Sequence, residues 1–238
     1  MKKVLIVTYS FPPAESACAK RADSFVKQLN KYGWEPLILA GNVKIKSVPA
    51  PAGAAGTAAP EGMEIVRTAP WRAENLPTPF RQVAGFFSSL LMPDRERLWE
   101  LSSIRKAVRL ARSAGADLIY TLSPPSSAHL IGMRLKRKNP DIPWVADFYM
   151  AADTKGGGLK KIREQYVNNL VDSVMDGADC IITGDPALGD VLNKSRGNAG
   201  EQTEICCVPN GHVQELTEQF EKACRVIAAR KLSKNNDE

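Results

Sequence analysis

The sequence is poor in the residues that build metal centres and disulfide frameworks. Its 238 residues include five cysteines and two histidines, and no two cysteines form a C-x-x-C pair. The odd number of cysteines and the missing spacing argue against a disulfide framework or a zinc site, and they indicate a reducing compartment. With His129 and His212 as the two histidines, a Ser-His-Asp triad or a multi-histidine metal site has little support. We therefore expect no bound metal.

Long apolar segments are also missing. Two lysines precede a first apolar run over 4–7, whereas a signal peptide needs about 7–15 apolar residues. The longest apolar-rich uncharged stretch outside low-complexity sequence is 82–93, which is much shorter than the ~20 residues of a membrane-spanning helix. We expect a cytoplasmic protein, with peripheral contact at the inner face of the membrane as an open alternative.

Glycine-rich phosphate loops are absent. The loop after the first apolar run reads Ser10-Phe-Pro-Pro-Ala-Glu-Ser-Ala, without the glycines of a dinucleotide-binding G-x-G-x-x-G motif. The Walker motif and the G-x-S-x-G nucleophile elbow do not occur either. We expect no cofactor, and a stand-alone nucleotide-binding enzyme of another kind is the weakest interpretation.

The net charge is positive, at +6, and residues 1–60 hold eight Lys/Arg against three Asp/Glu. No Lys/Arg-rich tract with interleaved aromatic residues occurs, so nucleic acid is not an expected partner. A basic face that attracts phosphates or an anionic membrane surface fits this composition better.

What the chain does contain is an alternation of short β-rich runs and helical patterns. The apolar run over 4–7 is typical of a strand buried on both faces, and 16–31 has apolar residues at helical spacing, ending at Gly33. Seven such strands separated by helices predict an α/β fold, a doubly wound parallel sheet. In this fold the strand-to-helix loops share one edge, where ligands bind. The expected strands are 4–7, 34–39, 63–66, 117–122, 143–147, 179–183 and 204–208, and the expected helices are 16–31, 81–91, 100–113, 126–138, 160–175, 186–194 and 213–231.

Five short motifs follow one another along the chain: Phe11-Pro12-Pro13, Met92-Pro93-Asp94-Arg95, Ser123-Pro124-Pro125-Ser126-Ser127-Ala128-His129, Pro143-Trp144-Val145-Ala146-Asp147-Phe148 and Val208-Pro209-Asn210-Gly211. Together they resemble the N-terminal half of glycosyltransferase family 4, whose GT-B-fold enzymes move a sugar from a nucleotide donor to an acceptor. The resemblance implies a Rossmann-like glycosyltransferase N-terminal domain over 1–211 and a C-terminal helix over 212–238 that crosses back onto it. The family's donor-binding C-terminal domain is expected to be absent.

The sequence departs from the family in three places. The first loop has Ala14-Glu15-Ser16-Ala17 where the family usually has a glycine pair, and Asp147-Phe148-Tyr149-Met150 replaces Asp-Phe-Arg-Asp. The chain also stops soon after Gly211. The resemblance therefore implies the acceptor-binding half of a glycosyltransferase of polysaccharide biosynthesis, which needs a partner donor-binding subunit and is inactive alone. The alternative is a non-catalytic binding or scaffold module derived from such an enzyme.

A candidate acceptor site follows from the resemblance and from the position of the loops, and no catalytic residue is assigned. Asp147 closes a buried strand, and we predict that it faces the ligand together with Tyr149. Structural alternatives stay open for others: Ser16 as helix N-cap beside solvated Lys20 and Arg21, Ser126 or Ser127 as a second cap, and a partly buried structural His129. The candidate residues are Ser10, Phe11, Pro12, Glu15, Ser16, Lys20, Arg21, Ser123, Pro124, Ser126, His129, Asp147 and Tyr149.

The segment 81–92 is unusually apolar, with Phe86, Phe87 and Leu90 among its residues. It packs in the core in one interpretation. In the other it contacts a lipid-linked sugar acceptor or the bilayer surface, supported by the flanking arginines Arg72, Arg81, Arg95 and Arg97.

Overall fold

The computed structural model describes residues 1–41, 63–69, 97–149, 160–199, 203–209 and 211–236. Two features singled out in the sequence lie outside the described residues: the apolar segment 81–92, with the helix expected over 81–91, and the motif at 92–95.

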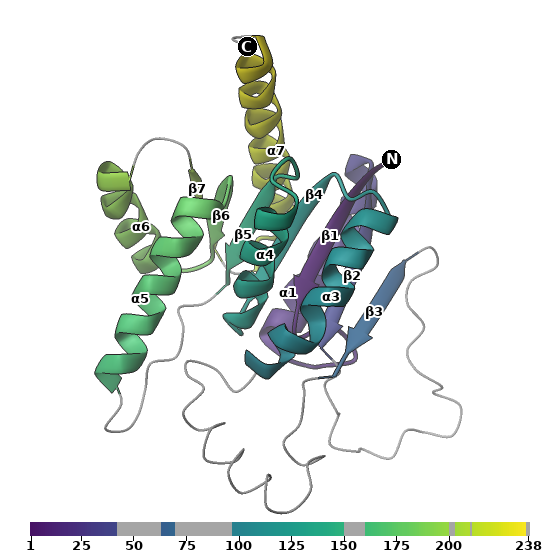
Figure 1. Ribbon diagram of the computed structural model, residues 1–238, viewed down its shortest axis with the longest axis horizontal. Helices are drawn as coiled ribbons and strands as arrows, with labels where there is room; N and C mark the ends of the chain where they lie inside the picture. Colours follow the sequence, from purple (N-terminus) through teal and green to yellow (C-terminus); the bar gives the residue numbers. More distant parts are fainter. Residues whose placement is uncertain (42–62, 70–96, 150–159, 200–202, 210, 237–238) are drawn as a thin grey trace, which may run out of the picture.

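Seven parallel strands form a single sheet in the order β3-β2-β1-β4-β5-β6-β7 (Figure 1). The strand order reverses between β1 and β4, as in a doubly wound fold, so the expected fold class is confirmed. The strands are β1 (Lys2–Thr8), β2 (Trp34–Gly41), β3 (Glu64–Thr68), β4 (Leu118–Ser123), β5 (Trp144–Phe148), β6 (Cys180–Thr183) and β7 (Glu204–Cys207).

The central strand β1 shows why these sequences form buried strands. Side chains alternate between the two faces of a strand. Val4 and Ile6 pack into one hydrophobic cluster, whereas Leu5 and Val7 pack into the other, and all four are fully buried. Because both faces of the sheet are covered, the strand is apolar at each of positions 4–7 rather than at every second one.

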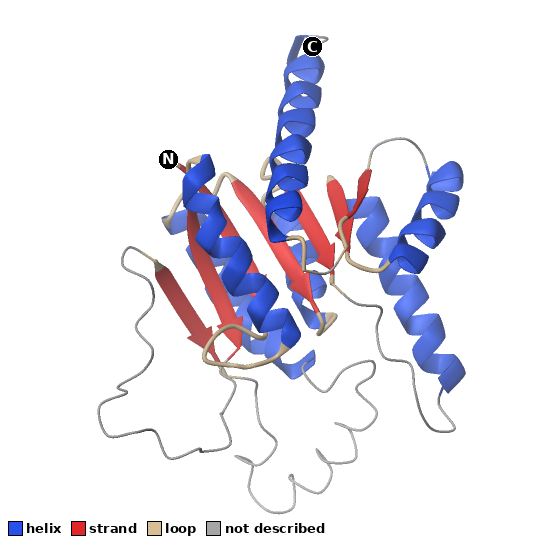
Figure 2. Ribbon diagram, turned by 180° about the vertical axis from the view of Figure 1, so that it is seen from behind, coloured by secondary structure: helices blue, strands red, loops and turns tan. Residues whose placement is uncertain are grey.

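Helices cover both faces of the sheet (Figures 1 and 2). On one face α1 and α7 contribute to the first hydrophobic cluster, and on the other α3, α4, α5 and α6 contribute to the second. None of the described helices has both the length and the apolar character needed to cross a membrane. The helices are α1 (Ala17–Leu29), α3 (Arg97–Ser113), α4 (Ser127–Lys138), α5 (Lys160–Gly177), α6 (Pro186–Ala199) and α7 (Val213–Asn236).

Helix α1 has defined signals at both ends. Ser16 is its N-cap, and the Ser16 hydroxyl accepts a hydrogen bond from the backbone N–H of Ala19 at 3.1 Å. After Leu29 a short 3₁₀ turn (Asn30–Tyr32) leads to Gly33, whose φ of 79° is in the left-handed region that glycine adopts without strain. Both the Ser16 cap and the predicted stop at Gly33 are confirmed.

Helix α7 begins at the predicted residue and extends to Asn236 rather than to 231. Its buried stripe packs on the same cluster as α1: Leu216, Phe220, Ala223 and Ile227. The ring of Phe220 lies 5.3 Å from that of Phe25 and 5.8 Å from that of Tyr120, measured between centroids. The C-terminal helix therefore completes the hydrophobic core of the sheet, and its far end extends past the strands (Figure 1).

Candidate functional site

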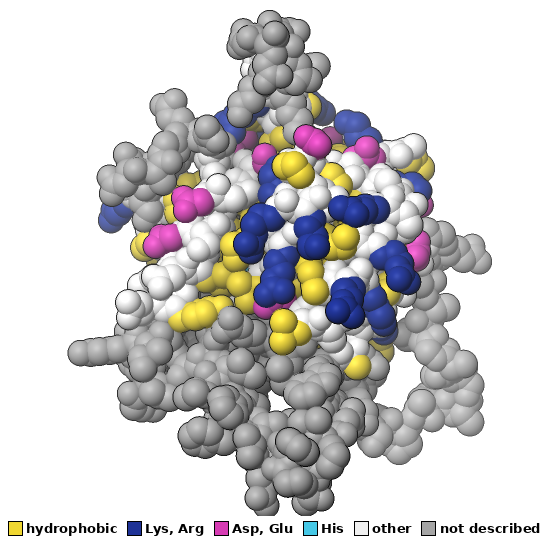
Figure 3. Space-filling view, in the orientation of Figure 1, with side chains coloured by type: hydrophobic (Ala, Val, Ile, Leu, Met, Phe, Trp, Pro, Cys, Tyr) yellow, Lys and Arg dark blue, Asp and Glu magenta, His cyan; other side chains and the backbone are white. Residues whose placement is uncertain are grey.

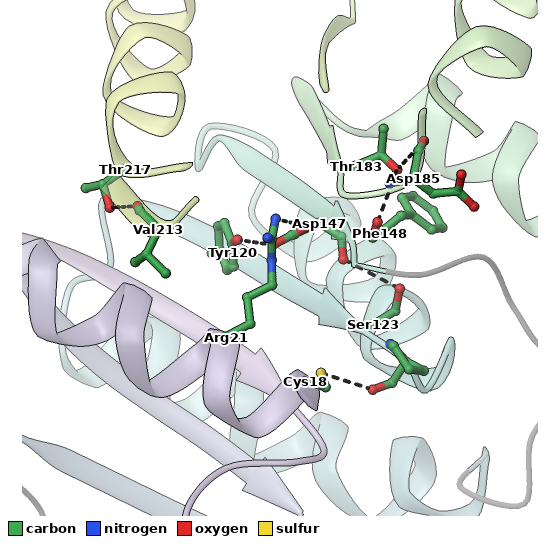
Figure 4. A network of polar contacts seen from close by, with 11 residues as sticks. Cys18, Arg21, Tyr120, Ser123, Asp147, Phe148, Thr183, Asp185, Val213 and Thr217 are labelled. Carbon is green, nitrogen blue, oxygen red and sulfur yellow. Dashed lines mark hydrogen bonds and ion pairs between the residues drawn. The ribbon is translucent and has the colours of Figure 1, made fainter. Parts of the chain in front are cut away.

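The described residues that follow β1, β4 and β5, namely 9–16, 124–126 and Tyr149, meet at the carboxyl edge, the edge of the sheet at which the parallel strands end. The Cys18 thiol, at the start of α1, donates a hydrogen bond to the carbonyl oxygen of Pro124 at 3.4 Å. The backbone N–H of Tyr149 donates to the carbonyl oxygen of Ser123 at 3.2 Å. Segments more than a hundred residues apart in sequence are thus held together here (Figure 4).

A buried ion pair lies at the centre of this region. Arg21 of α1 donates from Nε to Asp147 Oδ2 at 2.8 Å and from Nη2 to Asp147 Oδ1 at 3.0 Å (Figure 4). The Tyr120 hydroxyl donates a third hydrogen bond to the same carboxylate. The Arg21 and Asp147 side chains are 5% and 0% exposed. Arg21 and Asp147 therefore bind each other, and Tyr120 satisfies the remaining capacity of Asp147 Oδ2.

The electrostatics of this cluster shift the pKa values of Arg21, Tyr120 and Cys18. Burial alone would lower the pKa of Arg21, but the Asp147 carboxylate raises it above its usual value, so the guanidinium stays charged. Burial, and then the Asp147 charge, raise the pKa of Tyr120 well above its usual value. The same two causes raise the pKa of Cys18 to about 12. Cys18 is consequently a neutral thiol and not an activated nucleophile.

This geometry corrects one sequence interpretation. Arg21 is not solvated, because the phase of α1 places it on the buried face with Cys18 and Phe25. Its guanidinium lies over the ring of Tyr149, 5.2 Å from the centroid. Asp147, which the sequence predicts to face the ligand, is fully buried and bound to Arg21. Tyr149, which is half-buried, is the more accessible member of the pair predicted to face the ligand.

The candidate residues in the loop after β1 and at the start of α1 differ in their exposure. Phe11 is buried in the core, whereas Ser10 and Pro12 are half-buried. Arg67 of β3 donates a hydrogen bond to the carbonyl oxygen of Pro12, which ties this loop to the edge of the sheet. At the start of α1 three candidate residues are exposed: Glu15, Ser16 and Lys20.

The loop after β4 contributes one buried and two accessible candidates. Ser123 is buried, and its hydroxyl donates to the carbonyl oxygen of Asp147 at 3.5 Å. Pro124 is exposed and Ser126 is half-buried. Ser126 occupies the N-cap position of α4, but its side chain makes no capping hydrogen bond. The expectation that Ser126 caps this helix is right in position and wrong in its hydrogen bonding.

His129 lies on the opposite face of the sheet from Arg21 and Asp147. Its ring packs on Phe148 with centroids 4.2 Å apart, and His129 Nδ1 is 2.8 Å from Thr121 Oγ1. The indole N–H of Trp144 donates to that same hydroxyl oxygen at 2.9 Å. Because an indole can only donate, Thr121 Oγ1 accepts from Trp144 and keeps its own proton and one lone pair, with which it can donate to His129 Nδ1 or accept from it. The alternative of a structural histidine is supported, and its burial is complete rather than partial.

Buried His129 is expected to make the protein sensitive to acid. Burial lowers its pKa from 6.5 to about 3, so between these values the unfolded chain binds one proton more than the folded one. Stability from this group is full above pH 6.5 and falls as the pH decreases towards 3, by up to about 1.4 kcal/mol per pH unit. Urea unfolding measured at several pH values should show a weaker acid dependence for His129→Asn. The exposed His212 provides the control, and an equal loss of slope in His212→Asn would contradict the assignment.

Sequence reasoning missed Tyr120, Thr121 and Trp144 as partners of the candidate residues. A signal for Tyr120 exists in the sequence, because it is the one aromatic residue in the strand next to that of Asp147, and its hydroxyl can donate to a carboxylate. In the parallel register Tyr120 pairs with Val145, two residues before Asp147, so both side chains point to the same face. The described residues contain no group of three or more His, Cys, Asp or Glu side chains that could hold a metal ion.

The sequence and the fold both resemble those of known proteins. The sequence matches the family described as glycosyl transferase 4-like domain over residues 16–211, and no curated protein matches it. A solved structure of sucrose-phosphate synthase from Thermosynechococcus elongatus is similar, with a TM-score of 0.54 and 14% identity, over 95% of this chain and 99% of that chain. Phytolacca americana UGT2, complexed with UDP-2fluoro-glucose and pterostilbene, gives a TM-score of 0.49 and 15% identity over 86% of this chain and 53% of that chain.

Acinetobacter baumannii MurG gives a TM-score of 0.38 and 11% identity, over 88% of this chain and 68% of that chain. At 14% identity the likeness to sucrose-phosphate synthase concerns the fold alone, and the family assignment rests on the sequence match. That match spans most of the chain and includes the loops after β4 and β5 that form the carboxyl edge. The chain belongs to the glycosyl transferase 4-like family.

Proposed function

We propose that this chain is the acceptor-binding half of a glycosyltransferase that transfers a sugar from a nucleotide donor. The proposal rests on one observation: the described part of the carboxyl edge has few positive charges that are not already paired. In the loops after β1, β4 and β6 and the first five residues of α1, α4 and α6, Arg21 is bound to Asp147, and Lys20 is the one exposed cation. A departing nucleoside diphosphate needs several positive groups or hydrogen-bond donors around it. The described part of this edge offers too few.

The donor site is therefore proposed to come from a second, donor-binding domain on a partner subunit. The accessible candidate side chains with polar groups at this edge are neutral or carry a single charge, namely Ser10, Glu15, Ser16, Lys20, Ser126 and Tyr149. Hydroxyl groups and an aromatic ring are suited to orient the hydroxyl groups of a sugar acceptor through hydrogen bonds and ring contact.

Calorimetry with nucleotide sugars tests whether the donor site lies outside this chain. The isolated chain is expected to bind UDP- and GDP-sugars weakly, with a Kd of roughly 1 mM or weaker, which corresponds to about −4 kcal/mol, and to transfer no sugar. Lys20→Ala should leave this weak binding unchanged. A micromolar Kd for any nucleotide sugar on the isolated chain would show that the donor site is already present.

A second candidate function is a non-catalytic binding or scaffold module. The burial of Arg21 and Asp147 favours it, because two polar residues at the family's ligand edge serve the fold. Co-expression with an isolated donor-binding glycosyltransferase domain separates the two candidates. Sugar transfer that appears only with both chains present supports the acceptor half, and transfer that is absent in every combination supports the scaffold.

We further propose that the protein works in polysaccharide biosynthesis in the cytoplasm, on an acceptor carried by a lipid, and that it contacts the inner face of the membrane peripherally. The excess of basic residues supports contact with anionic lipid.

A further inference from the structure

The strongest charge asymmetry of the molecule lies on the face covered by α3 and α4. The two helices carry nine lysines and arginines and one acidic residue, Glu100, a net charge of +8. The whole chain has 32 basic and 26 acidic residues, a net charge of +6. The rest of the chain therefore sums to −2, and two neighbouring helices hold the entire positive excess. Figure 3 shows the resulting cluster of Lys and Arg side chains on this face.

The exposed side chains of α3 form one stripe along the helix. Leu101, Arg105, Arg109 and Arg112 are spaced by four, four and three residues, which places them on a single helical face, and all four are exposed. Leu101 is 56% exposed and lies at the end of the stripe where α3 begins. On the neighbouring helix α4, Arg137 and Lys138 are exposed as well.

Carboxylates within the fold neutralise little of this charge. Arg134 of α4 contacts the buried Glu100 of α3 at 2.7 Å, and Lys136 contacts Asp179 at 2.9 Å. Arg105, Lys106 and Arg109 have no carboxylate partner among the described residues. Basic residues in the last turn of a helix are explained by the helix dipole, but Arg105 and Lys106 are in the middle of α3. Within the described part of the chain, their charges are therefore not explained by ion pairs that stabilise the fold.

The helices of the opposite face carry half this excess, because α1 and α7 hold eight basic and four acidic residues. On α1, Arg21 is buried against Asp147 and Lys27 pairs with Asp23 at 2.6 Å, which leaves Lys20 as its exposed cation without a carboxylate partner in the described ranges. Helix α7 mixes three glutamates with its basic residues. Lys20 and Arg21, the basic residues among the candidate site residues, are thus poorly suited to lipid contact.

We propose that the α3–α4 face, made of Leu101, Arg105, Lys106, Arg109, Arg112, Arg137 and Lys138, docks on an anionic phospholipid surface. This inference rests on the membrane location given above and names the surface responsible. Clustered basic side chains at the surface attract anionic headgroups, and an exposed leucine beside them can enter the region between headgroups and acyl chains. Single-stranded nucleic acid fits less well, because its binding surfaces combine cations with exposed aromatic side chains. The large exposed apolar side chain on this face is aliphatic.

Vesicle co-sedimentation tests the surface directly. The parent protein should bind phosphatidylcholine vesicles that contain phosphatidylglycerol, and should not bind pure phosphatidylcholine. Arg105→Gln/Arg109→Gln should weaken this binding roughly 30-fold, since each basic residue near an anionic surface contributes about 1 kcal/mol. The loss should shrink at about 1 M salt, where the Debye length falls to about 3 Å. Leu101→Ser should weaken binding at low and high salt alike.

The matched control is Lys222→Gln/Arg225→Gln, which removes two exposed charges from α7 on the opposite face. It should bind vesicles like the parent protein, and unchanged thermal unfolding of both double variants shows that folding is intact. Equal losses in the two double variants, no binding by the parent, or tighter binding to an oligonucleotide than to the vesicles would each overturn the proposal. The assay contains no sugar donor or acceptor, so these outcomes leave the proposed transfer function to its own calorimetric test.

Discussion

Replacing Arg21 with Met is expected to lower the free energy of unfolding by about 3–5 kcal/mol. The substitution keeps an aliphatic chain of similar length but leaves the Asp147 carboxylate, which is 0% exposed, without its cation. The Tyr120 hydroxyl would remain as a hydrogen-bond donor to it, and one neutral donor does not offset the loss of a bidentate guanidinium. Urea unfolding followed by circular dichroism measures the change.

Two further variants make this result specific. Lys20→Met removes the neighbouring but exposed charge and should change stability by no more than about 0.5 kcal/mol. The triple variant Arg21→Met/Tyr120→Phe/Asp147→Leu replaces the whole polar cluster by apolar groups and should recover most of the loss, because no buried charge remains. If Arg21→Met were as stable as Lys20→Met, the ion pair would have no role in holding α1 to β5.

Replacing Phe220 with Ala should cost about 3–5 kcal/mol of unfolding free energy. The ring is fully buried between Phe25, Trp34 and Tyr120, so its removal leaves a cavity between α7 and the sheet. Arg225→Ala, at an exposed position of the same helix, is the control and should change stability by no more than about 0.5 kcal/mol. A melting temperature shared by the two variants would mean that α7 is not part of the cooperative core.

The sheet could be predicted from the sequence because its strands are short, almost wholly apolar and separated by helical patterns. All seven were expected, and the largest differences are at their ends. The signals are local, since a strand buried on both faces must be apolar wherever it lies in the chain.

The Arg21–Asp147 pair could not be predicted in the same way. The two residues are 126 positions apart, and neither local pattern contains information about the other. An arginine near the border of an amphipathic helix is ordinarily exposed, so the sequence favoured a solvated side chain. The spacing of Cys18, Ala22 and Phe25 around it indicates the buried face, but a partner carboxylate has to be known before a buried arginine becomes acceptable.

The separation of His129 from Arg21 follows from topology rather than from local pattern. Both residues are near the start of a helix that follows a strand, so both were assigned to one site. Right-handed crossovers that run in opposite directions along the sheet place their helices on opposite faces. The connection from β1 to β2 runs one way and that from β4 to β5 the other, so α1 and α4 lie on different faces. Strand order decides this, and the sequence alone did not provide it.

The closure of the core by α7 has a consequence for synthesis of the chain on the ribosome. Trp34 donates a hydrogen bond to Glu221, which is 187 positions later. Phe25 and Tyr120 leave the ribosome well before Phe220, which covers them. At about 5–20 residues per second, translation leaves Phe25 without that cover for roughly 10–40 s. During this interval the nascent chain exposes an apolar sheet face to other chains. Chaperones that act on nascent polypeptides are expected to bind this face, and slow translation of the codons between Phe25 and Phe220 should increase the yield of aggregates.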